Sequence, residues 1–187
     1  MNTKYLGFTL IELMVTMAIA GIMLGIAIPS FNDAIVNSRL TTVANKLMTS
    51  LNIAKSEAIK RGYQITIRRK GATAREWHSG WDIFVDINSN EAFNDDGDTT
   101  LCETNADGSP AEDCLLKTFD ALPTGLTLIT GGSTYKDYAA YSPSGMSTVV
   151  VGDTFHLCQD NTTAKSREIK INSVGRAYVK SPAVNCS

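Results

Sequence analysis

Residues 7–29 read GFTLIELMVTMAIAGIMLGIAIP and form the one long apolar run of the chain, with Glu12 as its only charged residue. As a helix with a rise of about 1.5 Å per residue, residues 8–28 would reach about 31 Å. That length matches the hydrocarbon core of a bilayer. The run is therefore expected to cross a membrane once.

The flanks of this run set its expected orientation. Lys4 is the one cation before it, so the positive-inside rule places the short leader in the cytoplasm and the rest of the chain outside. Pro29 follows the run, where a secretory signal peptide would carry a small-residue cleavage site. We therefore expect a retained single-pass anchor, with the bulk of the chain on the outer side of the membrane.

Glu12 is unusual because a carboxylate at mid-bilayer costs roughly 2.5 to 3.5 kcal/mol, and less near an interface. A charged residue in a membrane helix is therefore a candidate functional residue. The alternative is an interfacial side chain that reaches the lipid headgroups.

The sequence GFTLIE at residues 7–12, followed by an apolar helix that ends at Pro29, resembles the leader and N-terminus of type IV pilins and type II secretion pseudopilins. The resemblance implies cleavage between Gly7 and Phe8 by a prepilin peptidase, and N-methylation of Phe8. It also implies that Glu12 and Pro29 serve assembly, with Glu12 pairing with the N-terminal amine of a neighbouring subunit. Opposite charges in a low dielectric attract strongly, and either one alone is penalised there.

Composition leaves room for one soluble domain after the anchor, since the chain has 187 residues, of which 43% are hydrophobic and 19% charged. The net charge of −2 hides a segregation of charge, because residues 82–113 carry only acidic charges. Cations gather before and after that segment, and these runs are expected to be solvated faces or partner-binding surfaces. The cations are Lys55, Lys60, Arg61, Arg68, Arg69, Lys70 and Arg75, then Lys165, Arg167, Lys170, Arg176 and Lys180.

Four cysteines lie after the apolar run, on the side expected to be oxidising, which favours disulfides over free thiols. They are Cys102, Cys114, Cys158 and Cys186. Of the three possible pairings, we favour the local pair Cys102–Cys114 together with Cys158–Cys186, which would hold the C-terminal tail. Zinc is a weaker alternative because no C-x-x-C pair and no histidine cluster accompanies them.

The helical pattern continues beyond Pro29, so one helix is expected from about residue 8 to Arg61. Gly21, Gly25 and Pro29 predict a bend or a locally melted segment, and Gly62 suits the end of the helix. An apolar stripe at spacings of three and four predicts packing against a sheet. Its members are Leu40, Val43, Ala44, Leu47, Leu51, Ala54 and Ala58.

After Gly62 the apolar period changes from 3.6 to 2, which predicts short strands bounded by Gly, Pro, Asn or Ser. The expected strands are residues 63–69, 80–86, 115–119, 126–130, 138–141, 148–151, 154–157, 168–172 and 176–180. We predict an α+β fold, the pilin lollipop, in which a long N-terminal helix packs on a mainly antiparallel β-sheet head that contains disulfides. The expected parts are a leader (1–7), a transmembrane and filament-packing helix (8–29), an amphipathic half (30–61) and the head (62–187).

Five segments of the soluble part resemble, in order, the FimT/FimU/GspH branch of the pilin superfamily. They are SEAIKRG (56–62), GWDIFVDINSN (80–90), YSPSG (141–145), HLC (156–158) and REIKINSVGR (167–176). The resemblance implies one of three roles. FimU-like minor pilins help to prime pilus assembly, FimT-like ones bind DNA during natural transformation, and GspH-like pseudopilins serve type II secretion.

The oxygen-rich segment that starts at Asp86 begins like a calcium loop, D-x-N-x-N. It departs from that pattern because Glu91 stands where an EF-hand needs glycine and Gly97 where its bidentate glutamate should be. A polar hairpin loop is expected, with a weak calcium alternative. The candidate ligands are Asp86, Asn88, Asn90 and Asp96.

FimT-like DNA receptors carry a GRxR motif near the C-terminus, and here the matching residues 175–178 read GRAY, so Tyr178 replaces the second arginine. Arg176 alone carries over. Nearby cations could contact phosphates while Tyr178 stacks on a base. The same residues could instead form one ordinary solvent face of a strand. The possible DNA contacts are Arg176, Lys180, Lys170, Arg167, Lys165 and Tyr178.

The two histidines, His78 and His156, lie in no recognisable nucleophile or metal motif, and we expect no enzyme and no cofactor. Four aromatic residues are expected in the core rather than in a binding site: Trp77, Trp81, Phe84 and Tyr141. The sequence thus favours a minor type IV pilin that primes and joins the pilus fibre, with other pilins or pseudopilins, the prepilin peptidase and the inner membrane as partners.

Overall fold

A computed structural model describes residues 7–95, 97, 102–132, 135–148, 154–172, 174–182 and 186, with the side chains of residues 27–30 left out. The chain divides into two compact units, Met1–Ser38 and Arg39–Ser187. The boundary falls inside the segment expected to be the amphipathic half of the helix.

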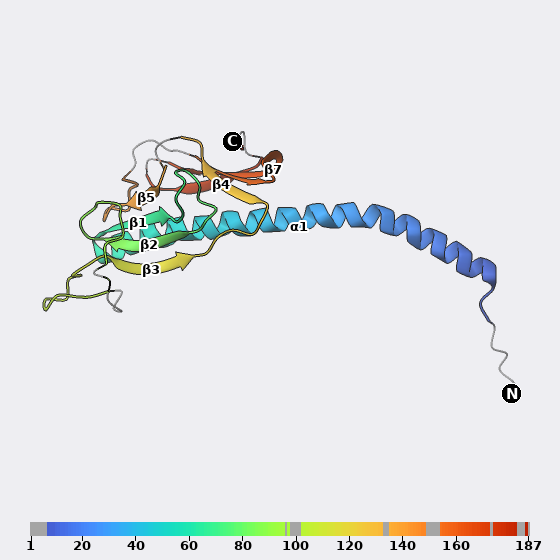
Figure 1. The fold of residues 1–187 in the computed structure, drawn as a ribbon, viewed down its shortest axis with the longest axis horizontal. Helices are drawn as coiled ribbons and strands as arrows, with labels where there is room; N and C mark the ends of the chain where they lie inside the picture. The colour runs from blue at the N-terminus through green and yellow to red at the C-terminus, as the bar shows by residue number, and fades with distance from the viewer. Residues whose placement is uncertain are drawn as a thin grey trace, which may run out of the picture. The chain divides into compact units, whose positions relative to one another are not determined.

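One helix, α1 (Leu10–Arg61), contributes to both units (Figure 1). It begins two residues later than expected because Thr9 caps it. Its backbone stays helical across Pro29, so the locally melted segment that the sequence allowed is not present. Gly62 follows the last turn, and its N–H donates a hydrogen bond of 3.0 Å to the carbonyl oxygen of Ala58.

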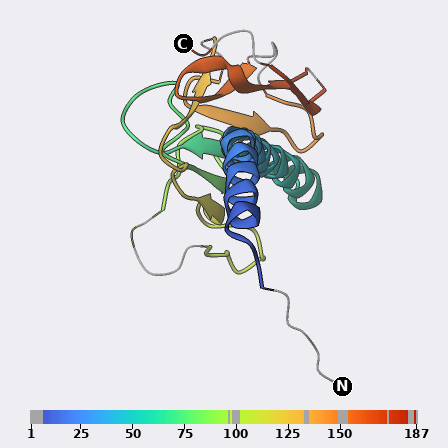
Figure 2. The same ribbon diagram turned by 90° about the vertical axis from the view of Figure 1, so that its right-hand side faces the viewer.

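Two four-stranded sheets make up the rest of the second unit. The strands are β1 (Gln64–Arg69), β2 (Trp81–Asp86), β3 (Cys114–Phe119), β4 (Leu126–Thr130), β5 (Tyr138–Tyr141), β6 (Thr154–Gln159), β7 (Thr162–Ile171) and β8 (Ala177–Lys180). The first sheet has the order β3-β2-β1-β5 and the second β4-β6-β7-β8. Figure 2 shows the orange and red strands of the second sheet above the green strands of the first.

Every pairing in both sheets is antiparallel, and the α+β class is as predicted. The expected meander is only partly right. β5 returns to pair with β1, and β4 pairs with β6, so both sheets contain neighbours that are not consecutive in sequence. Such pairings depend on contacts between distant segments, which local periodicity does not encode.

The buried face of α1 in the second unit is the apolar stripe expected from the sequence, from Leu40 to Ala58. Ser50 belongs to this face, and its hydroxyl accepts a hydrogen bond of 2.9 Å from the indole N–H of Trp81 on β2. Tyr135 stacks on Phe155 of β6, with ring centroids 5.4 Å apart. Trp77 meets Phe155 edge-on at 5.0 Å, so the aromatic core includes the second sheet as well.

Seven of the nine expected strands agree with the structure to within two residues at either end, and two do not. β7 begins at Thr162, six residues before the predicted start, and its first residues are exposed. A two-residue turn with positive φ angles at Asp160 (49°) and Asn161 (55°) joins it to β6, as in a tight hairpin. Of the strand expected at 148–151, residues 149–151 lie outside the described residues, and Thr148 lies in a bend.

The Ser50–Trp81 hydrogen bond yields a stability prediction. Ser50→Ala leaves the buried indole N–H of Trp81 without its acceptor, which should lower the free energy of unfolding by about 1 to 3 kcal/mol. The measurement is chemical denaturation of the full chain in detergent, followed by tryptophan fluorescence.

Ser56→Ala is the matched control, because Ser56 lies exposed on the same helix and its hydroxyl donates only to the carbonyl oxygen of Ile53. Its effect should stay within about 0.5 kcal/mol. Equal effects of the two substitutions would contradict the assigned role of Ser50.

Candidate functional site

The start of α1 is a capping box that involves Glu12. The backbone N–H and the hydroxyl of Thr9 both donate to Glu12 Oε2, at 3.0 and 2.9 Å, and the N–H of Glu12 donates to the hydroxyl of Thr9 at 3.3 Å. The pattern T-x-x-E was readable in the sequence but was overlooked. Glu12 therefore stabilises the helix start of its own chain, in addition to any role toward another subunit.

Gly7 and Phe8 precede the helix and are exposed, in backbone that is neither helix nor strand. The peptide bond between them is the expected cleavage site. A peptidase needs backbone that is not locked in regular structure, and this segment meets that requirement. The capping box starts at the next residue, Thr9, and the helical backbone begins at Leu10.

The first unit presents its apolar side chains to the outside. Each of the following is at least 50% exposed: Phe8, Leu10, Ile11, Leu13, Met14, Val15, Met17, Ile19, Ile22, Met23, Leu24 and Ile26. The most apolar 18 residues of α1 have a mean hydropathy of 2.2 and none is buried. By length and composition this stretch could cross a membrane. An exposed apolar surface of this extent needs lipid or other helices as cover.

The outer face of α1 in the second unit carries no charge over four turns. All the exposed residues of the segment 41–56 are small or amide side chains: Thr41, Thr42, Asn45, Thr49, Asn52 and Ser56. The charged residues of that segment lie at its half-buried flanks. A solvated helix face is usually rich in charge, so this face is suited to close packing against another helix. We call it the uncharged face.

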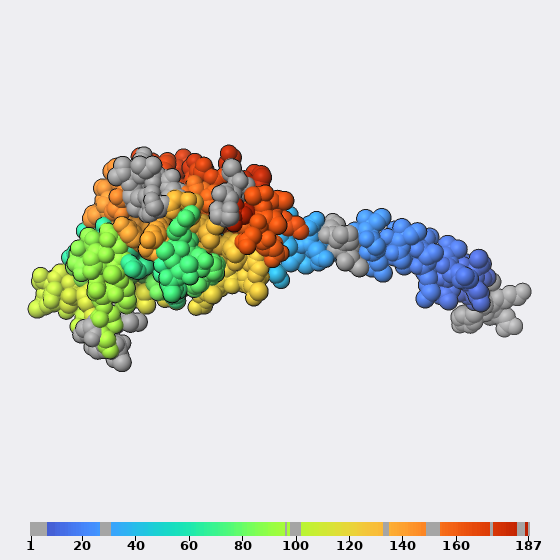
Figure 3. Space-filling view, turned by 45° about the horizontal axis from the view of Figure 1, so that its top comes forward, coloured from blue at the N-terminus to red at the C-terminus, as the bar shows by residue number. Residues whose placement is uncertain are grey.

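Two disulfides join the four cysteines, Cys102 to Cys114 and Cys158 to Cys186. The first closes part of the loop between β2 and β3, which protrudes from the second unit as yellow-green atoms in Figure 3. The second attaches Cys186 to the buried Cys158 of β6, and so anchors the C-terminal tail to the second sheet. Both hold segments that contribute little to the apolar core.

The basic residues near the C-terminus are divided among different environments. Lys180 of β8 lies opposite Glu168 of β7, and Tyr178 lies opposite Lys170. The Lys170 ammonium forms an ion pair of 2.8 Å with the buried Glu168 carboxylate, and this hydrogen bond raises the pKa of Lys170. Glu168 thus lies on the same sheet face as two of the proposed phosphate contacts and opposes their charge.

The other cations of this group lie elsewhere. The Arg167 guanidinium donates to the carbonyl oxygen of Ser166 and to the hydroxyl of Ser181. Arg176 is exposed but precedes β8, in the turn after β7, so the strand alternation expected to align it with Lys180 does not apply. Lys170, Tyr178 and Lys180 therefore share one face of the second sheet with Glu168, whereas Arg167 lies on the other face by strand alternation and Arg176 lies in the turn before β8.

Asp86 is fully buried and its carboxylate is occupied by protein donors. It accepts hydrogen bonds from the hydroxyl of Thr66, the amide of Gln64, and the backbone N–H groups of Asn90 and Glu91. The side-chain oxygens of Asn88 and Asn90 accept backbone N–H groups in the same way. This pattern is that of a hydrogen-bonded turn. Asp96, the fourth calcium candidate, lies outside the described residues.

Asp113 closes the other end of this loop. Its carboxylate oxygens accept the backbone N–H groups of Ile87 and Asn94, at 3.0 and 2.8 Å. Burial raises the pKa of Asp113 above its ordinary value, and the negative charge of Asp86 adds to the shift. Among the residues that the structure describes, no three His, Cys, Asp or Glu side chains gather as a metal site would require.

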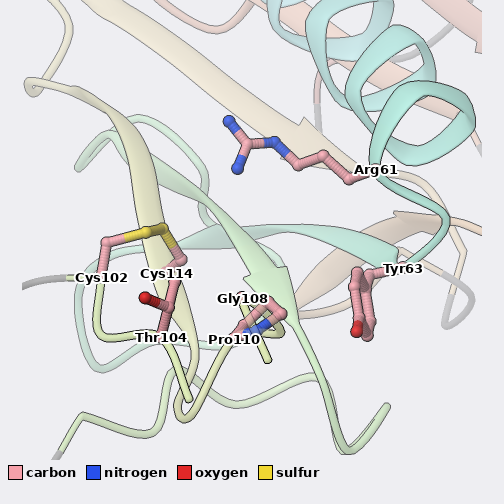
Figure 4. A pocket seen from close by; sticks show the side chains of 7 residues that line it. All are labelled: Arg61, Tyr63, Cys102, Thr104, Gly108, Pro110 and Cys114. Atoms are coloured by element: carbon pink, nitrogen blue, oxygen red, sulfur yellow. A yellow bond between two sulfur atoms is a disulfide. The ribbon is translucent and has the colours of Figure 1, made fainter. Parts of the chain in front are cut away.

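A shallow hollow lies between the end of α1 and the first disulfide (Figure 4). Its lining residues are Arg61, Tyr63, Cys102, Thr104, Gly108, Pro110 and Cys114. Arg61 is already paired with Glu57 one turn earlier in the helix. Apart from that paired guanidinium, the described lining is a disulfide, Tyr63 and small side chains.

The aromatic residues singled out in the sequence are structural. Trp77, Trp81, Phe84 and Tyr141 are all buried, as expected. The indole N–H of Trp77 donates to the carbonyl oxygen of Tyr135. His156 is also buried and lies opposite Glu168 in the β6–β7 pair.

Two family models match the chain. The model described as type II transport protein GspH matches residues 43–175, well over half of the chain. The model described as prokaryotic N-terminal methylation motif matches residues 2–28. Together they cover the apolar run and most of the second unit.

Individual relatives are pilins. The type IV major alpha-pilin of Moraxella bovis is 37% identical over 70 residues, which are 37% of this chain and 43% of that protein. A fimbrial protein of Pseudomonas aeruginosa is 41% identical over 59 residues, which are 32% of this chain and 38% of that protein. The matched segment thus spans less than half the length of these relatives.

Solved structures show the same fold. The type IV minor pilin FimU of Pseudomonas aeruginosa, in two crystal forms, superposes with TM-scores of 0.58 and 0.56 at 21% identity. The matches cover 80% and 79% of this chain and 96% and 100% of those chains. With the methylation motif and the apolar helix, the match to the GspH model establishes the family. The chain belongs to the GspH family, carries a prokaryotic N-terminal methylation motif, and shares the fold of the type IV minor pilin FimU.

Proposed function

We propose that the chain is a minor subunit of a type IV pilus, which helps to prime assembly and is then incorporated into the fibre. The observation that carries the proposal is the surface of α1. It exposes apolar side chains up to Ile26 and an uncharged face from Thr41 to Ser56. A helix with these two surfaces is suited first to a membrane and then to packing against the helices of other subunits.

The proposed sequence of events starts at the N-terminus. A prepilin peptidase removes residues 1–7 by cleavage between Gly7 and Phe8, and Phe8 is N-methylated. The processed subunit stays in the inner membrane through its apolar run, with the second unit in the periplasm. It then moves from the membrane into the growing fibre, where neighbouring helices replace lipid around its apolar residues.

Glu12 has two roles in this scheme. Within the chain it completes the capping box with Thr9. Within the fibre, its carboxylate pairs with the N-terminal amine of a neighbouring processed subunit. This pairing leaves neither charge alone in an apolar environment. The two roles can be separated because glutamine also completes a capping box but carries no charge.

A role as a type II secretion pseudopilin is the second candidate. The match of residues 43–175 to the GspH model supports it, and the fold is compatible with either system. Deletion of the gene distinguishes the two, since a pilus subunit affects surface fibres and a pseudopilin affects the export of folded proteins. The DNA-receptor alternative is less favoured, because Glu168 lies on the sheet face of Lys170 and Lys180, and Tyr178 stands where the GRxR motif has its second arginine.

The charge of Glu12 yields a prediction about assembly. Glu12→Ala and Glu12→Gln should both leave membrane insertion intact and reduce the amount of subunit in sheared pili by about tenfold or more, the order expected when about 1.4 kcal/mol or more is lost at a contact. The measurement is immunoblotting of sheared fibre and membrane fractions.

Thr9→Val serves as control, because it removes the hydroxyl of the capping box and keeps the charge of Glu12. It should retain most of the incorporation. If Glu12→Gln assembles normally while Glu12→Ala does not, capping rather than charge is the role of Glu12.

The uncharged face yields a second prediction. Thr49→Glu places a carboxylate in the centre of this face, where a packed neighbouring helix would exclude water, and should reduce incorporation into sheared pili severalfold. Glutamate is a good helix former, so the head should stay folded. The readout is the ratio of subunit in the fibre fraction to subunit in the membrane.

Thr163→Glu is the matched control, since Thr163 is exposed in the β6–β7 hairpin, away from α1 in sequence. It should assemble like the unmodified chain. Normal incorporation of Thr49→Glu would show that the uncharged face is not a packing surface.

A further inference from the structure

Three apolar side chains from three separate segments are exposed close together on the second unit. They are Ile59 of α1, Met146 after β5, and Val174 in the turn between β7 and β8, with exposed fractions of 56%, 51% and 57%. Gly145, directly before Met146, lies against the helix. It is so close that a Cβ atom added to it would be 2.7 Å from Cδ1 of Ile59. We call these three side chains the apolar patch.

Lys55 connects two of the segments that form the patch. Lys55, one turn before Ile59, donates a hydrogen bond of 3.0 Å from its ammonium to the carbonyl oxygen of Val174. Its Cε would lie 3.4 Å from a Cβ on Gly145, so the lysine stem runs between the helix and the two loops. The turn at Val174 is thus tied to α1.

Two glycines make this close approach possible. Gly145 and Gly175 have φ angles of +76° and +73°, which other residues adopt only with strain. A Cβ on Gly175 would lie 2.8 Å from Cε1 of Tyr141 and 2.9 Å from the carbonyl oxygen of Gly145. The two loops therefore touch each other as well as the helix. The arrangement is preformed, which lowers the entropic cost of binding a partner.

The border of the patch is positively charged. Lys60 follows Ile59 and Arg176 lies two residues after Val174, and both are exposed. The carboxylate of Glu57 lies on the same turn as Lys60, but it is shared with Arg61, which holds it more closely. The surplus of cations favours a partner that presents carboxylates beside its apolar contact.

The patch is also continuous with the uncharged face of α1. Ser56 is three and four residues before Ile59 and Lys60, so all three lie on adjoining positions of the helix surface. A subunit that packs its helix on the uncharged face would bring its own head toward the patch.

We propose that the apolar patch docks the head of a neighbouring pilin-family subunit, through an aliphatic side chain flanked by carboxylates. This inference rests on the proposed function and names the partner chemistry for it. Three side chains form a small contact, so the patch adds specificity to the packing of helices and does not replace it.

The test places a photoreactive p-benzoylphenylalanine at Met146 of the full chain, expressed in cells that assemble fibres. Irradiation should give an adduct with another pilin-family subunit, identified by mass spectrometry, with the crosslinked peptide containing Asp or Glu beside aliphatic residues. The same probe at Ala106, which is exposed in the loop closed by the first disulfide, should give at least about fivefold less of this adduct.

Charge reversal supplies the second arm. Arg176→Glu should lower the adduct yield from Met146 by about three- to tenfold, whereas Lys180→Glu, on the sheet face beside Glu168, should change it little. Once the partner's Asp or Glu in the crosslinked peptide is known, its replacement by lysine should restore the adduct yield of the Arg176→Glu variant. Equal losses for the two reversals would overturn the proposal.

The outcomes separate this inference from the proposed function. Adducts with lipid or with a protein outside the pilin family, or no adduct, while the chain is still recovered in sheared fibres, would overturn the docking surface and leave the fibre role standing. Absence of the chain from fibres, with a functional unmodified chain as reference, would overturn both.

Discussion

The helix α1 can bury only one of its faces against its own chain, and the rest of the structure depends on this constraint. Between Leu40 and Ala58 one apolar stripe fits under the strands and completes the core. Between Phe8 and Ile26 no protein covers the apolar side chains. The same helix must therefore find a second environment outside its own chain, first lipid and then other subunits in the account proposed above.

The second unit supplies a rigid support for the covered half of the helix. The Trp81–Ser50 hydrogen bond joins β2 to α1, and the Lys55–Val174 bond joins the β7–β8 turn to it. The two disulfides hold the protruding loop and the tail, which have few apolar residues of their own. The loop at Gly145 and the turn at Val174 both lie against the end of α1, so the fold defines the exposed surface around Ile59.

The sequence predicted the helix, its buried stripe and most strands, since these follow from local periodicity. β4 and β5 have the predicted bounds. The start of β7 was missed because residues 162–167 read TTAKSR, which carries no alternating apolar signal. The partition into two sheets was missed because the β1–β5 and β4–β6 pairings join segments distant in sequence.

The candidate site was predicted unevenly for similar physical reasons. The expected processing at Gly7 and Phe8 and the expected assembly role of Glu12 come from a local motif and stay predictions, whereas the capping box with Thr9, present in the same motif, is observed. The placement of the basic residues near the C-terminus could not be predicted from local pattern. Lys170 and Lys180 share a sheet face with Glu168 only through strand register, and Arg176 falls in a turn rather than in β8.

The central claim is that this chain is processed and built into a fibre. The most direct measurement is mass spectrometry of the N-terminus of the chain, recovered separately from sheared surface fibres and from the inner membrane. Chains in the fibre fraction should begin at Phe8 with a methylated amine. Recovery of the chain from the membrane alone, with residues 1–7 still attached, would contradict both processing and incorporation.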